Sequence, residues 1–213
     1  MSMSEIQKYR KKQMKALTNK VGVYALCDLN GIPIYVGQST DGIQSRVRRH
    51  LTSARSDIIA NRQIDPWEIA FVQAYPVNRL KDIPLLEASL FAKFHKQKPL
   101  MNGSIPVAEG RLLKGLPKPA EIIQMMPDEE LKVRKEPAFR LPRQIEHIGR
   151  LVDHILTVKD SPQLRRSLVA HFDRLDAYRA AFLKAGPAVR RAAGENMLFL
   201  SHNWDARPGD YFS

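Results

Sequence analysis

The spacing of hydrophobic and polar positions changes several times along the chain, and each change marks a predicted element. Apolar residues alternate with others over residues 21–27 and return over 32–36, on either side of the turn-forming pair Asn30-Gly31. This pattern predicts a β-hairpin. Pro33 has no N–H for a strand ladder, so its side of the second strand should lie at an edge or an irregularity of the sheet.

The next segments alternate between helix and strand periodicity. Apolar residues recur every three or four positions over 42–60 and over 83–97, which predicts two helices, and residues 67–75 read as a third strand between them. The first helix follows the cap candidates Ser39, Thr40 and Asp41. The order β-β-α-β-α predicts an α/β (α+β) fold, with a small, mostly antiparallel, three-stranded sheet flanked by helices.

The rest of the chain is organised differently. Residues 104–142 are rich in proline and predict a connector with short helical pieces, and two amphipathic stripes over 145–155 and 164–182 predict an antiparallel helical hairpin. A further helix is expected around 187–200. We therefore divide the chain into a basic N-terminal arm or helix (1–20), an α/β domain (21–103), a connector (104–142) and a helical C-terminal region (143–213).

The net charge of the chain narrows the classes of molecule that the protein is expected to bind. The 213 residues hold 34 Lys and Arg against 22 Asp and Glu, a net charge of +12 with a pI near 10.0. Such a chain suits a polyanion, and nucleic acid is the natural candidate, although solubility or an anionic membrane surface are alternative reasons. The single cysteine, Cys27, excludes an internal disulfide and is interpreted as a small buried hydrophobe. The sequence has no apolar run of about 18 residues, so we expect a cytoplasmic protein without a membrane span.

Several polar residues stand where this layout would bring them together. Tyr24 and Tyr35 frame the hairpin, and Arg46 and His50, four residues apart, share one face of the first helix close to the strand of Tyr35. Glu87 lies at the margin of the buried stripe of the second helix, where a carboxylate can bind a metal ion. The other histidines show no metal-ligand spacing.

These residues resemble the GIY-YIG nuclease superfamily over about residues 20–103. Gly22-Val23-Tyr24 is similar to the first signature triplet and Tyr35-Val36-Gly37 to the second. The downstream residues also follow the family order: Arg46, His50, Glu87 and Asn102. The resemblance implies an endonuclease that hydrolyses phosphodiester bonds with one divalent cation, Mg²⁺ or another such as Mn²⁺.

The resemblance also implies a role for each matched residue. Glu87 would hold the metal and Arg46 would bind the phosphate, which agrees with the chemistry of carboxylates and guanidinium groups. Tyr24 would act as general base, assisted by Tyr35 and His50, with His50 as the rival base. A tyrosine has a pKa of ~10, so ionising it at pH 7 costs about 4 kcal/mol. We therefore expect Arg46, the metal and the basic surroundings to lower the pKa of Tyr24.

Other interpretations remain open at this level. Each tyrosine could be an ordinary strand residue, the basic helix could contact DNA without catalysis, and Asn102 before Gly103 could be a turn residue. The function classes are a DNA endonuclease of restriction or mobile-element type, a non-catalytic DNA-binding protein on the same fold, and an RNA-directed or repair nuclease. Double-stranded DNA is the expected partner, and a homodimer through the C-terminal helices is a further expectation.

Overall fold

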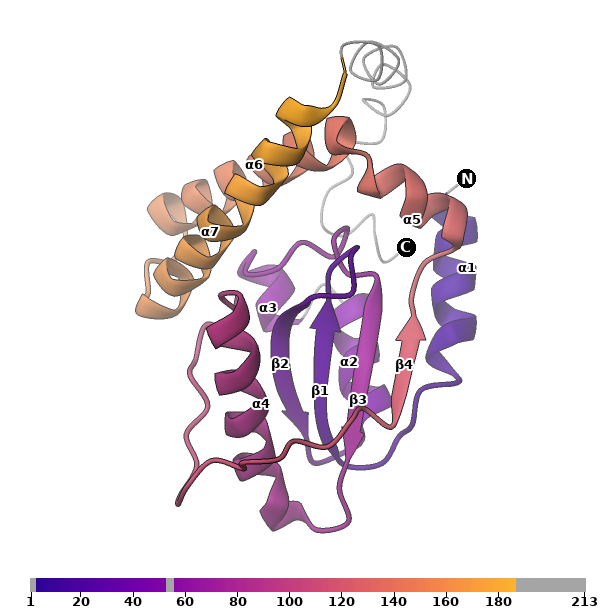
Figure 1. The fold of residues 1–213 in the computed structure, drawn as a ribbon, viewed down its shortest axis with the longest axis vertical. Helices are drawn as coiled ribbons and strands as arrows, with labels where there is room; N and C mark the ends of the chain where they lie inside the picture. The colour runs from indigo at the N-terminus through magenta and orange to yellow at the C-terminus, as the bar shows by residue number, and fades with distance from the viewer. Residues whose placement is uncertain (1–2, 53–55, 187–213) are drawn as a thin grey trace.

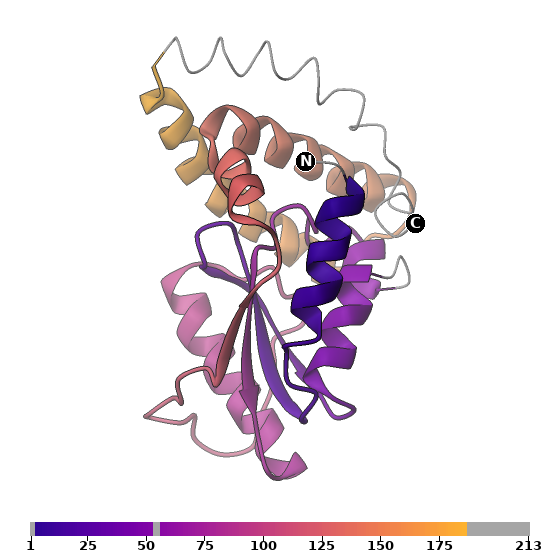
Figure 2. The same ribbon diagram turned by 90° about the vertical axis from the view of Figure 1, so that its right-hand side faces the viewer.

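A four-stranded antiparallel sheet lies between two layers of helices in the computed structural model, which describes residues 3–52 and 56–186 (Figures 1 and 2). The order across the sheet is β2-β1-β3-β4. The strands are β1 (Gly22–Cys27), β2 (Pro33–Ser39), β3 (Phe71–Pro76) and β4 (Glu121–Gln124). The α+β class is confirmed, and the sheet has one strand more than the three expected.

The predicted hairpin is β1 and β2, and its turn is closed by Asp28. One carboxylate oxygen of Asp28 accepts from the backbone N–H groups of Asn30 and Ile32, both at 2.9 Å. Gly31 takes a positive φ of 77°, which glycine adopts without the steric cost of a Cβ. Pro33 lies on an edge strand, beside the register shift at Cys27, as its missing N–H requires.

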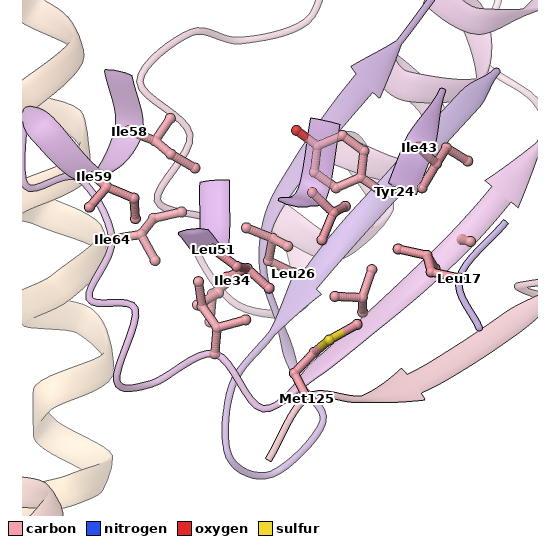
Figure 3. Packing of buried hydrophobic residues seen from close by; sticks show 14 of the residues in the cluster. Leu17, Tyr24, Leu26, Ile34, Ile43, Leu51, Ile58, Ile59, Ile64 and Met125 are labelled. Carbon is pink, nitrogen blue, oxygen red and sulfur yellow. The ribbon is translucent and has the colours of Figure 1, made fainter. Parts of the chain in front are cut away.

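Helices cover both faces of the sheet, which is why every residue of β1 is buried. Val23, Ala25 and Cys27 pack against α4 (Ile83–Gln97) on one face. Tyr24 and Leu26 face the other layer, where they join the cluster drawn in Figure 3. That cluster includes residues of α2 (Ile43–Thr52) and α3 (Asp57–Ala60), and residues from the N-terminal segment around α1 (Met3–Met14). The basic N-terminal segment is therefore a helix that is anchored at its end by Met14 and Leu17.

Two elements of the structure have bounds that differ from those predicted from the sequence. The single helix expected over 42–60 is wrong, because α2 ends at Thr52 and α3 begins at Asp57, after Ser56 in an extended conformation. The strand expected from residue 67 begins at Phe71, because Asp65 folds the preceding residues into a turn: its carboxylate accepts from the N–H of Trp67 at 3.1 Å. A short 3-10 helix, η1 (Leu80–Asp82), then leads into α4.

The region expected to be a proline-rich connector contains regular structure. Strand β4 pairs with β3 from Glu121 onward, and α5 (Asp128–Lys135) follows it. Helices α6 (Pro137–Thr157) and α7 (Pro162–Lys184) then pack against each other, and the boundary expected at residue 142 falls inside α6. The helix expected around 187–200 lies outside the described residues. Among the described helices, none has the length and apolar character needed to cross a membrane.

The α6–α7 hairpin docks on the α/β part of the chain through buried charges. Arg140 contacts Glu68 and lies 3.3 Å from Asp28, and Arg174 lies 3.7 Å from the same Asp28 oxygen. Each of these four side chains is at most 6% exposed. Arg143 forms a two-point ion pair with Asp65, at 2.8 and 2.9 Å. The hairpin is thus attached to the loops at one end of the sheet (Figure 1).

Candidate functional site

A cleft of about 390 Å³ lies where β2, α2 and α4 meet. Five of the six residues singled out in the sequence line it: Tyr35, Arg46, His50, Glu87 and Asn102. They come from β2, α2, α4 and the segment after α4, so the fold assembles them from positions up to 67 residues apart. Tyr24, the sixth, is 1% exposed and reaches the cleft through its contact with His50.

A buried chain of hydrogen bonds links Tyr24, His50 and Ser56. The Tyr24 hydroxyl lies 2.7 Å from Nε2 of His50, and Nδ1 of the same ring lies 2.6 Å from Oγ of Ser56. Burial, together with Arg46 and Arg49, lowers the pKa of His50 to about 4. The imidazole is therefore neutral at pH 7 and can accept a proton at one nitrogen.

The expectation that Tyr24 has a lowered pKa is wrong. Burial, and secondly the neighbouring Tyr35, raise the pKa of the Tyr24 hydroxyl well above 10, and the opposing effect of Arg46 does not overcome them. Burial likewise raises the pKa of Tyr35 to about 12. Both tyrosines are neutral phenols at pH 7, so a proton that leaves Tyr24 needs an acceptor, and His50 is the base within hydrogen-bond distance.

Arg46 and Glu87 supply opposite charges to the same cleft. Nε of Arg46 is buried and has no hydrogen-bond partner among the described residues, so this donor is available to a ligand. Burial raises the pKa of Glu87 to about 7, which gives a carboxyl group that changes charge near neutrality. The described residues contain no group of three or more His, Cys, Asp or Glu that could hold a metal ion, so a cation at Glu87 would need further ligands from water or substrate.

Residues 20–98 match a family model described as the GIY-YIG catalytic domain. This segment is a GIY-YIG domain. The match runs from Lys20 to Lys98, the residue after α4, and includes every cleft residue named above except Asn102. Comparison with curated proteins and with solved structures found no match. The GIY-YIG family is a family of nucleases.

The glycine of the second GIY-YIG triplet has a packing reason. Gly37 pairs with Tyr24 across the β1–β2 ladder. A Cβ at Gly37 would lie 2.5 Å from the hydroxyl oxygen of Tyr24 and 2.8 Å from Cε1 of Tyr35. Only a residue without a side chain leaves the two rings, whose centroids are 6.3 Å apart, in their observed positions.

Asn102 lines the cleft of the GIY-YIG domain, but both ends of its amide are engaged by the backbone. Its Oδ1 accepts from the N–H of Val36 at 3.0 Å, and its Nδ2 donates to the carbonyl of Val36 at 2.6 Å. This pair of bonds fixes the segment after α4 to β2, beside Tyr35. The geometry favours a role in positioning the strand over direct contact with a substrate.

Sequence reasoning missed several residues of the site. Ser56 stood inside an expected helix, and Gln63, which also lines the cleft, stood in an unassigned loop. The backbone carbonyl of Gln63 accepts from Ser167 and His171 of α7, each at 2.9 Å. The C-terminal hairpin therefore supports a wall of the GIY-YIG cleft, and no local pattern in the sequence indicates these long-range contacts.

Proposed function

We propose that the protein is a metal-dependent endonuclease that hydrolyses phosphodiester bonds in double-stranded DNA. The observation that carries the proposal is the Tyr24–His50 hydrogen bond, with a neutral imidazole, in the cleft that also holds Arg46 and Glu87. A proton acceptor, a phosphate-binding cation and a metal-binding carboxylate together suit metal-assisted hydrolysis of a phosphodiester.

The net charge of +12 supports a polyanionic substrate, because lysine and arginine release condensed counterions when they meet phosphates. The cleft belongs to a nuclease family domain, so nucleic acid satisfies both observations. We propose that this nuclease domain, joined to a helical C-terminal region, serves in restriction or in a mobile element.

Glu87 fits the single-carboxylate binding of a hard cation. Mg²⁺ keeps several of its waters and is commonly held by one or two carboxylates together with substrate phosphates. Glu87 lines an open cleft, and burial raises its pKa to about 7, so the carboxylate gains from a cation that replaces its lost hydration. When bound, Mg²⁺ or Mn²⁺ would neutralise charge on the scissile phosphate and the leaving oxygen.

The protein groups then divide the remaining work. Arg46 binds a non-bridging phosphate oxygen and offsets the negative charge that grows during attack. Tyr24 takes a proton from the attacking water at its hydroxyl oxygen as it gives its own proton to Nε2 of His50. This transfer avoids a free phenolate, whose formation would cost more than the about 4 kcal/mol expected for an unperturbed tyrosine at pH 7. Tyr24 and His50 therefore act as one coupled base.

Cleavage of supercoiled plasmid tests the proposal. We expect nicked or linear product with Mg²⁺, and none with EDTA or with Glu87→Gln. Glu109→Gln, at an exposed glutamate, is the matched control and should cut like the unmodified protein. Tight DNA binding without cleavage under any divalent cation would favour a non-catalytic binding protein, and cleavage of RNA alone would replace DNA as the substrate.

A homodimer is the assembly that we propose for cutting both strands. The α6–α7 hairpin buries one side against the GIY-YIG domain and leaves Val169 and Phe172 of α7 61% and 53% exposed. Such apolar exposure on a helix suits a second chain. Light scattering should give twice the chain mass, and Phe172→Glu should reduce it to that of one chain without abolishing nicking.

A further inference from the structure

Ser56 occupies an unusual position beside the cleft. It precedes α3, the place of a helix-capping residue, yet its side chain makes no capping hydrogen bond in the described structure. The residue is 2% exposed, and its hydroxyl oxygen lies 2.6 Å from Nδ1 of His50. The hydroxyl is therefore committed to the imidazole.

The two neighbours of His50 compete to decide which ring nitrogen carries the proton. A neutral imidazole has one N–H donor and one acceptor, whereas the hydroxyls of Tyr24 and Ser56 can each donate or accept. A phenol is a stronger acid than the alcohol of a serine, so Tyr24 is the better donor to the imidazole, at Nε2, and Ser56 is the better acceptor. Nδ1 must then hold the ring proton and donate it to Ser56.

We propose that Ser56 is a positioning residue, which holds His50 in the Nδ1–H tautomer so that Nε2 can accept the proton of Tyr24. The proposal rests on the nuclease function proposed above, because the tautomer matters only if Tyr24 loses a proton during the reaction. It adds a third member to the Tyr24–His50 pair, from the residue directly before α3.

Removal of the hydroxyl has a defined consequence. In Ser56→Ala, an Nδ1–H would point at a buried methyl group and lose its acceptor, which is costly for a buried donor. The ring would shift toward the Nε2–H tautomer, which donates to Tyr24 and cannot take its proton. Outer-shell partners that orient a metal-ligating histidine typically contribute about 10–100-fold to activity, and by analogy we expect a loss of that size in the single-turnover cleavage rate.

The first measurement is the side-chain ¹H–¹⁵N correlation spectrum of His50 in the full chain without metal or DNA, assigned by the loss of its signals in His50→Gln. We expect a protonated Nδ1 and an unprotonated Nε2 in the unmodified protein, and proton density on Nε2 in Ser56→Ala. A protonated Nε2 in the unmodified protein would overturn the proposal, whether or not the variant folds.

The second measurement is cleavage under single-turnover conditions with saturating Mg²⁺. Ser56→Ala should cut about 10–100-fold more slowly with unchanged affinity for DNA, and Ser56→Thr, which keeps a hydroxyl, should recover most of the rate. Equal rates for Ser56→Ala and the unmodified protein would refute the positioning role, and so would equal losses in the Ala and Thr variants. The spectrum reports on the tautomer whether or not the protein cleaves DNA. A protein that shows the expected tautomer but cuts nothing would therefore refute the nuclease function. The assignment of the Nδ1–H tautomer to the Ser56–His50 contact would still hold.

Discussion

Replacing Arg140 tests whether the α6–α7 hairpin is held to the GIY-YIG domain by buried charge. Arg140 is 5% exposed and contacts both Glu68 and Asp28, which are 1% and 0% exposed. Arg140→Met keeps most of the aliphatic volume and removes the cation. Loss of one partner of a buried ion pair typically costs about 3–5 kcal/mol, because the other charge stays buried without compensation. With a urea m-value of about 2 kcal/mol/M, the unfolding midpoint should fall by about 2 M.

The pH dependence separates lost charge pairing from lost packing. Burial raises the pKa of Glu68 to about 7 even though Arg140 opposes this rise. At pH 8 Glu68 is ionised and needs Arg140, whereas at pH 5 it is largely protonated in the folded protein and needs the cation less. The destabilisation by Arg140→Met should therefore be largest at pH 8 and smaller at pH 5. A loss caused by packing alone would be the same at both values.

Two further variants complete the urea experiment. Arg179→Met, in the same hairpin, removes an arginine that is 59% exposed and pairs with Asp176. It should cost no more than about 1 kcal/mol. Arg140→Met combined with Glu68→Gln should recover part of the loss, since no uncompensated charge remains at residue 68. A cost for Arg140→Met that matches Arg179→Met would refute the buried-charge account of hairpin docking.

Three other outcomes follow from the geometry. Gly37→Ala should displace the Tyr24 ring, lower the cleavage rate at least tenfold and cost about 1–3 kcal/mol of stability. The control is Gly149→Ala, because a Cβ at this position in α6 meets open space, and it should be neutral or stabilising in thermal unfolding. The Mg²⁺ concentration for half-maximal cleavage should rise up to about tenfold per pH unit as pH falls below about 7, because protons compete with metal for Glu87; a constant requirement from pH 5.5 to 8 would contradict this. Burial lowers the pKa of His171 to about 3, whereas an unfolded histidine has a pKa of about 6.5. The stabilising effect of the neutral ring is therefore complete above pH 6.5 and is lost as pH falls toward 3. His171→Gln should flatten the slope of unfolding free energy against pH between pH 6.5 and 4 by about 1.4 kcal/mol per pH unit.

The N-terminal half of the fold could be predicted because its signals are local. The Asn30-Gly31 turn and the alternation around it give the hairpin, and the apolar stripe of 83–97 gives α4, since each is decided by neighbours in the sequence. The break between α2 and α3 could not be predicted. The apolar stripe continues through Ile58, and nothing in the sequence indicates that Ser56 is extended and contacts His50.

The prolines of residues 104–142 do not prevent regular structure in this region. Strand β4 is four residues long and gains its stability by pairing with the edge of β3, which no periodicity of its own could indicate. Pro142 lies inside α6, although proline normally ends a helix because it lacks an N–H and crowds the preceding turn. Helix α6 nevertheless continues through Pro142, and it packs on both α5 and α7.

Buried acids could not be recognised for a similar reason. Nothing near Asp28, Asp65 and Glu68 in the sequence indicates that they are buried, because their arginine partners follow at least 72 positions later. Burial alone would raise the pKa of Asp65, but the ion pair and hydrogen bonds with Arg143 outweigh it and hold the pKa below its usual value. The same long-range pairing explains why the sequence left the role of the C-terminal helices open.

These long-range contacts join the stability of the protein to the shape of its cleft. Asp28 closes the β1–β2 hairpin through one carboxylate oxygen and meets Arg140 and Arg174 through the other, so the hairpin that carries both tyrosines is tied to α6 and α7. Arg166 donates to the carbonyl of Gly103, directly after Asn102, and α7 also holds the Gln63 carbonyl. Because Gln63 and Gly103 both line the cleft, docking of the C-terminal helices helps to give the cleft its observed form. The helices therefore belong to the catalytic unit that we propose, whatever further part they take in binding DNA or a second chain.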